Sequence, residues 1–230
     1  MNPTPAQAEA RAPHVRLRKF LGRIRRRFNV DRFDVFLRPV PEDAEPPSGP
    51  EGYRFAWGSP EDIEACDEFH TELDARERRA GVARLGIGHR VVVGFHGDLA
   101  VFSMWVNPRN LNVPGLMKRA LADDQWFIYK AYTSPEHRGR KLYEGGMRFV
   151  LAEMRAAGLR ELVGYAHVKK RISRKGLAAL SFRSGGRAVQ VDWPGFRRVF
   201  LSAELRRAFP RPLPPSGHPL YPDAPPSDPR

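Results

Sequence analysis

The chain has 230 residues, 41% of them hydrophobic, which is enough for one ordinary domain with a real core. It carries 39 Lys or Arg against 26 Asp or Glu, a net charge of +13, and this balance favours acidic partners such as nucleic acid, an anionic membrane or a phosphate-bearing ligand. The single cysteine, Cys66, excludes an intrachain disulfide and a cysteine-based zinc cluster. No run approaches the ~18 apolar residues of a membrane span and no apolar leader is visible, so we expect a cytoplasmic protein.

Residues 1–50 form a basic extension that ends in the proline-rich and acidic break 41–52. Within it, residues 11–38 hold ten Lys or Arg against two Asp, and apolar residues recur at helical spacing over 14–28. A cationic amphipathic helix suits peripheral contact with an anionic membrane. Docking of the same apolar stripe on its own domain, or self-association with a second subunit, is the favoured interpretation, because the run "FDVFL" that follows is typical of a strand that returns the segment to a sheet.

Residues 51–208 carry the fold. In chain order we expect a strand at 53–57, a helix that begins at Ser59 with Pro60 in its first turn, and two strands around the turn 96–98. Cys66 lies on the apolar stripe of that helix and is predicted to be a core residue. A long segment, 107–124, precedes a strand at 125–133. A helix at 139–157, a strand at 159–168, a helix at 173–186 and strands at 187–193 and 196–205 follow, and this order implies a mixed sheet with helices on its faces.

Residues 209–230 contain nine of the 22 prolines, and this composition predicts a disordered, partly polyproline-like tail.

The stretch "TSPEHRGRKLYEGG", residues 133–146, connects the expected strand 125–133 to the expected helix 139–157. The first turn of a helix leaves N–H groups unpaired at the positive end of the helix dipole. The side chains of Arg138, Arg140 and Lys141 would reinforce such an anion site. A solvated basic turn is the alternative interpretation.

This stretch resembles the pyrophosphate-binding arm of the GNAT family, the Gcn5-related N-acyltransferases, whose pattern is hydrophobic-x-x-Pro-x-x-Arg-Gly-x-Gly-x-Gly/Ala. The matching residues are Thr133, Pro135, Arg138 and Gly139, followed by 140–143. A weaker second match lies in "KGLAALSFRSGGR", with Ala178, Phe182 and Gly186 in register with a family helix. The resemblance covers about residues 53–200. It implies an α/β (α+β) fold with a mixed, mostly antiparallel twisted sheet and flanking helices.

The resemblance also implies an activity: transfer of an acyl group, expected to be acetyl from acetyl-CoA, to a primary amine by direct attack and without a metal. Backbone amides of 139–143 would hold the pyrophosphate, and the end of the preceding strand would hydrogen-bond the pantetheine like an added strand. The basic run 169–175 would meet the 3′-phosphate or an anionic acceptor, or is merely a solvated loop. The implied cofactor-binding residues are Ala131, Thr133, Arg138, Gly139, Arg140, Lys141, Leu142, Tyr143 and Lys175.

Three positions depart from the family pattern. Lys141 and Tyr143 stand where the family has glycines, and Phe182 stands where many members have the tyrosine that protonates the departing thiolate. Phenylalanine cannot donate a proton. Either another side chain supplies the proton, the thiolate leaves unassisted, or the site is degenerate. If another side chain supplies it, Tyr143 and Ser181 are the candidates by proximity.

The candidate general bases are Asp123, Asp124 and His167, and each has a purely structural alternative. The sequence does not distinguish sugar amines, amino acids and peptides as the acceptor amine, and the segment 107–124 is expected to form part of the acceptor pocket wall.

Two rival functions remain: an inactive fold that only binds acyl-CoA, and a basic nucleic-acid-binding module. The second is disfavoured because the sequence has no helix-turn-helix, zinc or RNP pattern.

Overall fold

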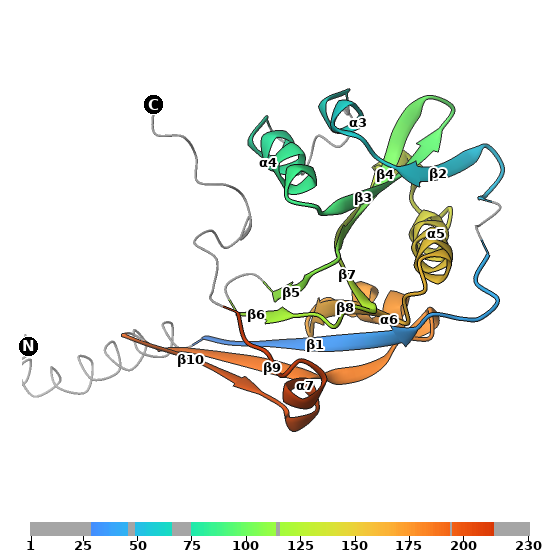
Figure 1. The fold of residues 1–230 in the computed structure, drawn as a ribbon. Coiled ribbons are helices and arrows are strands. Elements are labelled where there is room, and N and C mark those ends of the chain that lie inside the picture. The colour runs from blue at the N-terminus through green and yellow to red at the C-terminus, as the bar shows by residue number, and fades with distance from the viewer. Residues whose placement is uncertain (1–28, 46–48, 66–74, 114–115, 194, 214–230) are drawn as a thin grey trace, which may run out of the picture.

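A computed structural model of the chain describes residues 29–45, 49–65, 75–113, 116–193 and 195–213 (Figure 1). The expected amphipathic helix 14–28 and Cys66 lie outside these residues. Within the described part of the chain, no helix is long and apolar enough to cross a membrane.

The fold is built on one eight-stranded sheet in the order β10-β9-β1-β8-β7-β4-β3-β2. Neighbouring strands are antiparallel except β7 and β8, which are parallel, so the predicted mixed, mostly antiparallel sheet is confirmed. The strands are β1 (Asn29–Pro39), β2 (Tyr53–Trp57), β3 (Arg90–His96), β4 (Leu99–Asn107), β7 (Gln125–Thr133), β8 (Glu161–His167), β9 (Arg183–Trp193) and β10 (Phe196–Leu201).

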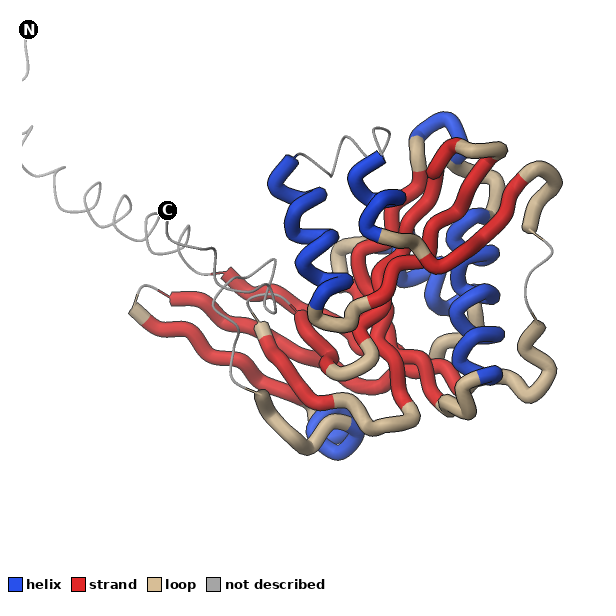
Figure 2. The backbone as a smooth tube through the Cα atoms, turned by 45° about the horizontal axis from the view of Figure 1, so that its top comes forward, coloured by secondary structure: helices blue, strands red, loops and turns tan. Residues whose placement is uncertain are grey.

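Helices lie on both faces of this sheet (Figure 2). The side chains on both faces of its central strands are therefore buried. On β4, Phe102 and Met104 face α5 (Leu142–Ala156), whereas Trp105 faces the pair α3 (Pro60–Ala65) and α4 (Ala75–Gly86). The contact with α5 is close: a methyl group on Gly146 would lie 2.4 Å from the ring of Phe102. The remaining helices are the 3₁₀ turn η1 (Pro135–His137), α6 (Arg171–Ala179) and α7 (Ala203–Ala208).

Strand β1 lies inside the sheet, which corrects the domain boundary set at residue 51. It pairs with β8 from Phe33 to Pro39 and with β9 from Asn29 to Leu37. Val35 is fully buried and Leu37 is 4% exposed, both in the core that also contains β7 and β8. Removal of residues 29–39 would therefore open the sheet in its middle, so the domain begins at or before Asn29.

The carboxyl-terminal boundary also needs correction. The expected strand 196–205 ends at Leu201, and Ser202 caps α7 by accepting a hydrogen bond from the Leu205 amide. Residues 209–213 then pack on the fold: Phe209 is 1% exposed, and the Leu213 amide donates to the Lys118 carbonyl at 3.1 Å. The expected disordered tail thus does not begin at 209, and residues 214–230 lie outside the described chain.

The segment 107–124 folds into a second, two-stranded sheet of β5 (Asn110–Val113) and β6 (Met117–Ala120), which the sequence did not predict. Its apolar residues join the core around β1 and α7: Leu111 is fully buried and Val113 is 1% exposed. Part of this segment is therefore core structure.

Candidate functional site

Strands β7 and β8 form a wedge that opens toward the amino terminus of α5. Their parallel pairing is confined to three residue pairs, from Gln125–Glu161 to Phe127–Val163. Beyond these pairs, β7 runs on to Thr133 and β8 to His167 without pairing to each other. The two facing edges beyond Phe127 can therefore hydrogen-bond an extended ligand inserted between them.

A β-bulge lies on β7 along this wedge. The register with β4 shifts by one residue between the pairs Trp105–Tyr129 and Ser103–Tyr132, and Lys130 has a positive φ of 51°. Ala131 follows the bulge and is exposed. The bulge changes the direction of the strand edge at the residue that the family resemblance assigns to the pantetheine.

The arm between β7 and α5 is a tight basic turn. Arg138 donates from Nε to the Thr133 carbonyl at 3.2 Å, which closes the turn around η1. Gly139 has φ +77°, and Lys141, the residue before α5, has φ +59°. The left-handed backbone at 139 suits glycine, whereas lysine at 141 carries a moderate strain.

The amides of this arm are available to a ligand. Among the described residues, the N–H groups of 139–143 donate to no backbone carbonyl, and no side chain caps α5. The helix behind them has 15 residues, so its dipole is fully developed. An anion bound here would satisfy donors that the fold leaves open.

A cavity of about 450 Å³ adjoins the arm on the side of β2. Arg140, Lys141 and Arg148 line it together with Glu144 and residues from the turn 49–53. Glu144 forms an ion pair with Arg148 at 2.6 Å, so Arg140 and Lys141 carry the positive charge that is not neutralised in the described structure.

Tyr143 points from the first turn of α5 toward α6. A methyl group on Gly176 would lie 3.7 Å from its ring, and the ring packs against the buried cluster beneath α5. Burial raises the pKa of the Tyr143 hydroxyl to about 12, because the phenolate would lose solvation. The group is therefore neutral at physiological pH and can donate a proton but not serve as a base.

Asp123 and Asp124 lie at the wrong end of β7. Asp124 immediately precedes the strand, and its carbonyl accepts from the amides of Arg160 and Glu161 at the closed end of the wedge. Ala131 lies seven positions further along the strand, roughly 20 Å away. Asp124 therefore lies too far away to take a proton directly in a reaction beside Ala131.

His167 ends β8 with both ring nitrogens occupied. Nδ1 accepts from the Lys169 amide at 3.0 Å, so the proton is on Nε2, which donates to Asp31 at 3.1 Å. This hydrogen bond lowers the pKa of the Asp31 carboxyl. Because no lone pair remains for an amine proton, the structure assigns His167 a structural role and not that of the predicted base.

The basic run 169–175 divides into two kinds of residue. Arg174 pairs with the buried Asp34 at 3.1 Å, and Arg187 holds the other oxygen of the same carboxylate at 2.6 Å. Lys175 is exposed on α6. Arg174 is thus a structural cation, and Lys175 stays a candidate for phosphate contact.

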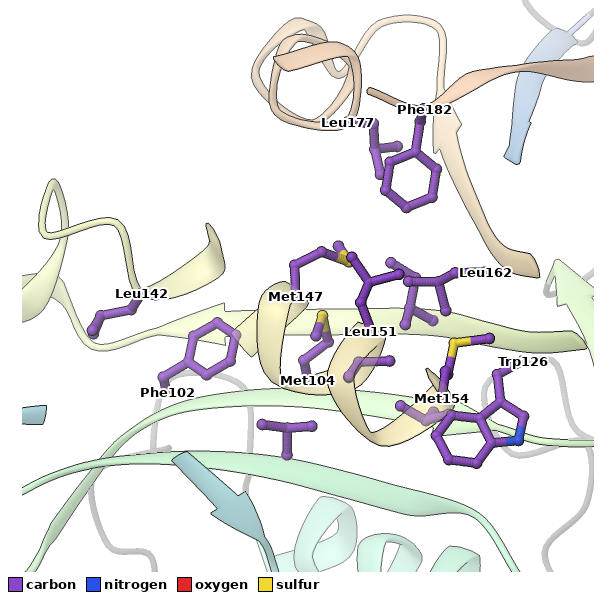
Figure 3. Close-up of a cluster of buried hydrophobic side chains, with 14 of the residues drawn as sticks. Phe102, Met104, Trp126, Leu142, Met147, Leu151, Met154, Leu162, Leu177 and Phe182 are labelled. Atoms are coloured by element: carbon purple, nitrogen blue, oxygen red, sulfur yellow. The ribbon is translucent and has the colours of Figure 1, made fainter. Parts of the chain in front are cut away.

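Phe182 is a core residue outside α6, which ends at Ala179 (Figure 3). It is 8% exposed and packs beside Leu177 and over Gly164 of β8. Ser181, with φ +60°, is exposed in the turn between α6 and β9. The expected helix over 173–186 is therefore shorter than predicted, and Ser181 and Phe182 do not share a helical turn.

The structure brings together a pair that the sequence did not suggest. His89 Nδ1 and the Tyr129 hydroxyl are 2.5 Å apart, with Tyr129 on β7 just before the bulge. Forty residues separate them in the chain, so no local spacing could have indicated the contact. Tyr129 faces the side of the sheet away from α5, stacked on Phe127.

Among known proteins, only solved structures match this chain. No family model matches the chain, and no curated protein matches its sequence. A functionally unknown conserved protein from Staphylococcus epidermidis aligns with a TM-score of 0.50 and 12% identity, covering 75% of this chain and 66% of its own. A GCN5-related N-acetyltransferase from Kribbella flavida has a TM-score of 0.46 and 18% identity, with coverages of 77% and 64%.

AAC(6')-Iy, in complex with a bisubstrate analog of coenzyme A and acetylneamine, has a TM-score of 0.45 and 15% identity over 57% of this chain and 90% of its own. This chain thus spans about two thirds or less of the first two structures and most of the third. What it shares with the Staphylococcus epidermidis protein is the fold. Among the described residues, no group of three or more His, Cys, Asp or Glu side chains could hold a metal ion.

Proposed function

We propose that the chain is a GNAT-type, acyl-CoA-dependent N-acyltransferase that transfers an acetyl group to a primary amine. The observation that carries this proposal is the wedge between β7 and β8, which opens at an uncapped helix start with two unneutralised cations. Coenzyme A has matching parts: an extended amide-bearing pantetheine for a strand edge, and a pyrophosphate for a helix start.

The binding residues follow from this placement. The pantetheine would lie along β7 at Ala131 and Thr133, and the pyrophosphate would meet the amides of 139–143. Arg140 and Lys141 would add charge-assisted contacts, while Arg138 shapes the turn through its bond to the Thr133 carbonyl. Lys175 is proposed to contact the 3′-phosphate from α6.

The reaction joins the amine nitrogen to the thioester carbonyl carbon and breaks the carbon–sulfur bond. A backbone N–H near Ala131 would stabilise the oxyanion, and holding both reactants in the wedge would supply proximity. For the amine proton we propose the Tyr129–His89 pair, in which the imidazole takes the proton through the phenol. Tyr143, neutral because of its raised pKa, is the proposed donor to the departing thiolate.

A binding measurement tests the proposal. Titration calorimetry should show acetyl-CoA binding by the full chain, and the double variant Arg140→Glu/Lys141→Glu should weaken it about 10- to 100-fold, since each reversal costs ~1 kcal/mol or more. Arg206→Glu/Arg207→Glu on α7 makes the same change in net charge at exposed sites and is the matched control. Equal acetyl-CoA affinity of the two double variants would show that the arm does not take part in binding.

Turnover distinguishes the enzyme from an acyl-CoA sensor. Lys141 and Tyr143 at glycine positions, and Phe182 at the position of the family tyrosine, keep this alternative open. Free thiol release from acetyl-CoA should be measured across sugar amines, amino acids and peptides. Accelerated release with one amine class identifies the acceptor. Tight acetyl-CoA binding with no release for any amine supports the sensor.

A further inference from the structure

One side of the β9–β10 hairpin carries a row of large apolar side chains. Residues that face each other in an antiparallel ladder project to the same side of the sheet. The hairpin register therefore places three facing pairs together, here called the hairpin face: Trp193–Phe196, Val191–Arg198 and Val189–Phe200.

The aromatic members of the hairpin face are exposed. Trp193, Phe196 and Phe200 have exposed fractions of 47%, 48% and 58%. The opposite side of β9 is covered, since Ala188 there is fully buried in the cluster that includes Leu205 of α7. The tip of this hairpin, with the start of β1 beside it, extends away from the described helices (Figures 1 and 2).

The charges on this side are cationic. Arg198 lies within the hairpin face, with its guanidinium carbon 5.4 Å from the Phe196 ring centre, and Arg32 of β1 faces Val189. The carboxylate on this side, Asp34, is buried and already held by Arg174 and Arg187. Asp192 projects to the other side, where it pairs with Arg197.

We propose that the hairpin face is a docking surface for an anionic lipid bilayer. Tryptophan and phenylalanine side chains insert at the level of the headgroups, and arginines beside them contact lipid phosphates. The chain's net charge of +13 would draw it to such a surface. This inference concerns location and is independent of the proposed acyl transfer.

The charge distribution favours lipid over a second copy of the chain. A symmetric dimer through the hairpin face would bring Arg198 and Arg32 of both copies into one interface, and the described strands offer no unpaired carboxylate there to neutralise them. An anionic bilayer supplies that charge. Lipid therefore complements both the aromatic and the cationic parts of the face.

The basic segment 14–28 is also a poor cover for this face. It contains seven Lys or Arg and no acidic residue, so it adds to the positive charge. An anionic bilayer complements that charge as well.

Vesicle co-sedimentation with the full chain tests the proposal. We expect binding to phosphatidylcholine vesicles that contain phosphatidylserine, and little binding to phosphatidylcholine alone. Phe196→Ser/Phe200→Ser should lower the affinity for the anionic vesicles about tenfold or more, because it removes exposed apolar surface without touching the core. Leu99→Ser, which changes an exposed apolar residue at the other end of the sheet, should leave it unchanged.

Intrinsic fluorescence provides an independent measure, because Trp193 is the exposed tryptophan of the described chain. Anionic vesicles should shift the emission to shorter wavelength, and Trp193→Phe should abolish the shift. Equal vesicle affinity of the wild type and the double variant would overturn the proposal and assign binding to segment 14–28. Absence of vesicle binding, or a dimer that the double variant dissociates, would overturn it as well.

Discussion

At the scale of single residues, Tyr143 shows how burial can fix a protonation state. Its raised pKa, about 12, means that the folded protein keeps the phenol protonated where the unfolded chain, with a pKa near 10, ionises it. Folding stability associated with Tyr143 is therefore complete below pH 10 and is lost as the pH rises toward 12.

This shift gives a measurable prediction. Between about pH 10 and 12, the unfolding free energy of the wild type should fall relative to that of Tyr143→Phe by up to ~1.4 kcal/mol per pH unit, measured by urea denaturation. Acetyl-CoA affinity at pH 7 should be unchanged. Parallel pH curves for the two proteins would show that the hydroxyl is solvated and not packed against α6.

Phe182 lacks the hydroxyl of the tyrosine that the family resemblance predicts at this position, and its role can be tested by adding that hydroxyl. Phe182→Tyr would place a hydroxyl in the packed space beside Leu177 and Gly164. We expect a loss of ~1–3 kcal/mol in stability if it has no partner there, with turnover per folded molecule unchanged or raised. Denaturant unfolding and a thiol-release assay on the same sample separate the two effects. Lost turnover with normal acetyl-CoA affinity and stability would place Phe182 against the substrate.

At the scale of elements, sequence patterns predicted what is local. The strand 125–133 has the predicted bounds, and the turn 96–98 joins β3 to β4 as expected. Each pattern lies within a few residues: alternating apolar side chains, a His-Gly-Asp turn, or a strand followed by a basic helix start. The arm was recognisable for the same reason.

Features that depend on distant partners were missed. The run 33–37 predicted a strand that returns to a sheet, but nothing within residues 29–39 indicates that its partners are β8 and β9, which lie more than 120 residues away. The sequence of the segment that forms β5 and β6 indicates a loop, because strands of only four residues each are too short to show a clear pattern. The same limit applies to the candidate site. The sequence suggested Asp124 and His167 as bases, whereas the contact of Tyr129 with His89, which we propose for that role, forms only in the folded chain.

The position of β1 predicts the result of truncation. A chain beginning at Asn29 should fold and bind acetyl-CoA, whereas one beginning at Glu51 should be insoluble or fail to bind, because β8 and β9 would lose their shared partner. Circular dichroism and calorimetry on both chains would measure this. A folded, binding-competent chain from Glu51 would mean that β9 can close directly on β8, and would restore the boundary first predicted from composition.

At the scale of the whole molecule, a charge of +13 attracts any polyanion, so binding to nucleic acid at low salt would not by itself identify a function. The salt dependence separates the two classes of ligand. Duplex DNA held by six to ten phosphate contacts should lose roughly 10³–10⁵ in affinity between 50 and 200 mM salt.

In the proposed binding mode, acetyl-CoA should lose only about tenfold over the same range, because short hydrogen bonds from the open amides of 139–143 and the edge of β7 would be screened weakly by salt. Filter binding for DNA and calorimetry for acetyl-CoA in matched buffers give the two slopes. Arg140→Glu/Lys141→Glu should flatten the acetyl-CoA slope, whereas Arg206→Glu/Arg207→Glu should leave it unchanged. DNA binding that survives 200 mM salt while acetyl-CoA binding collapses would instead favour the nucleic-acid module.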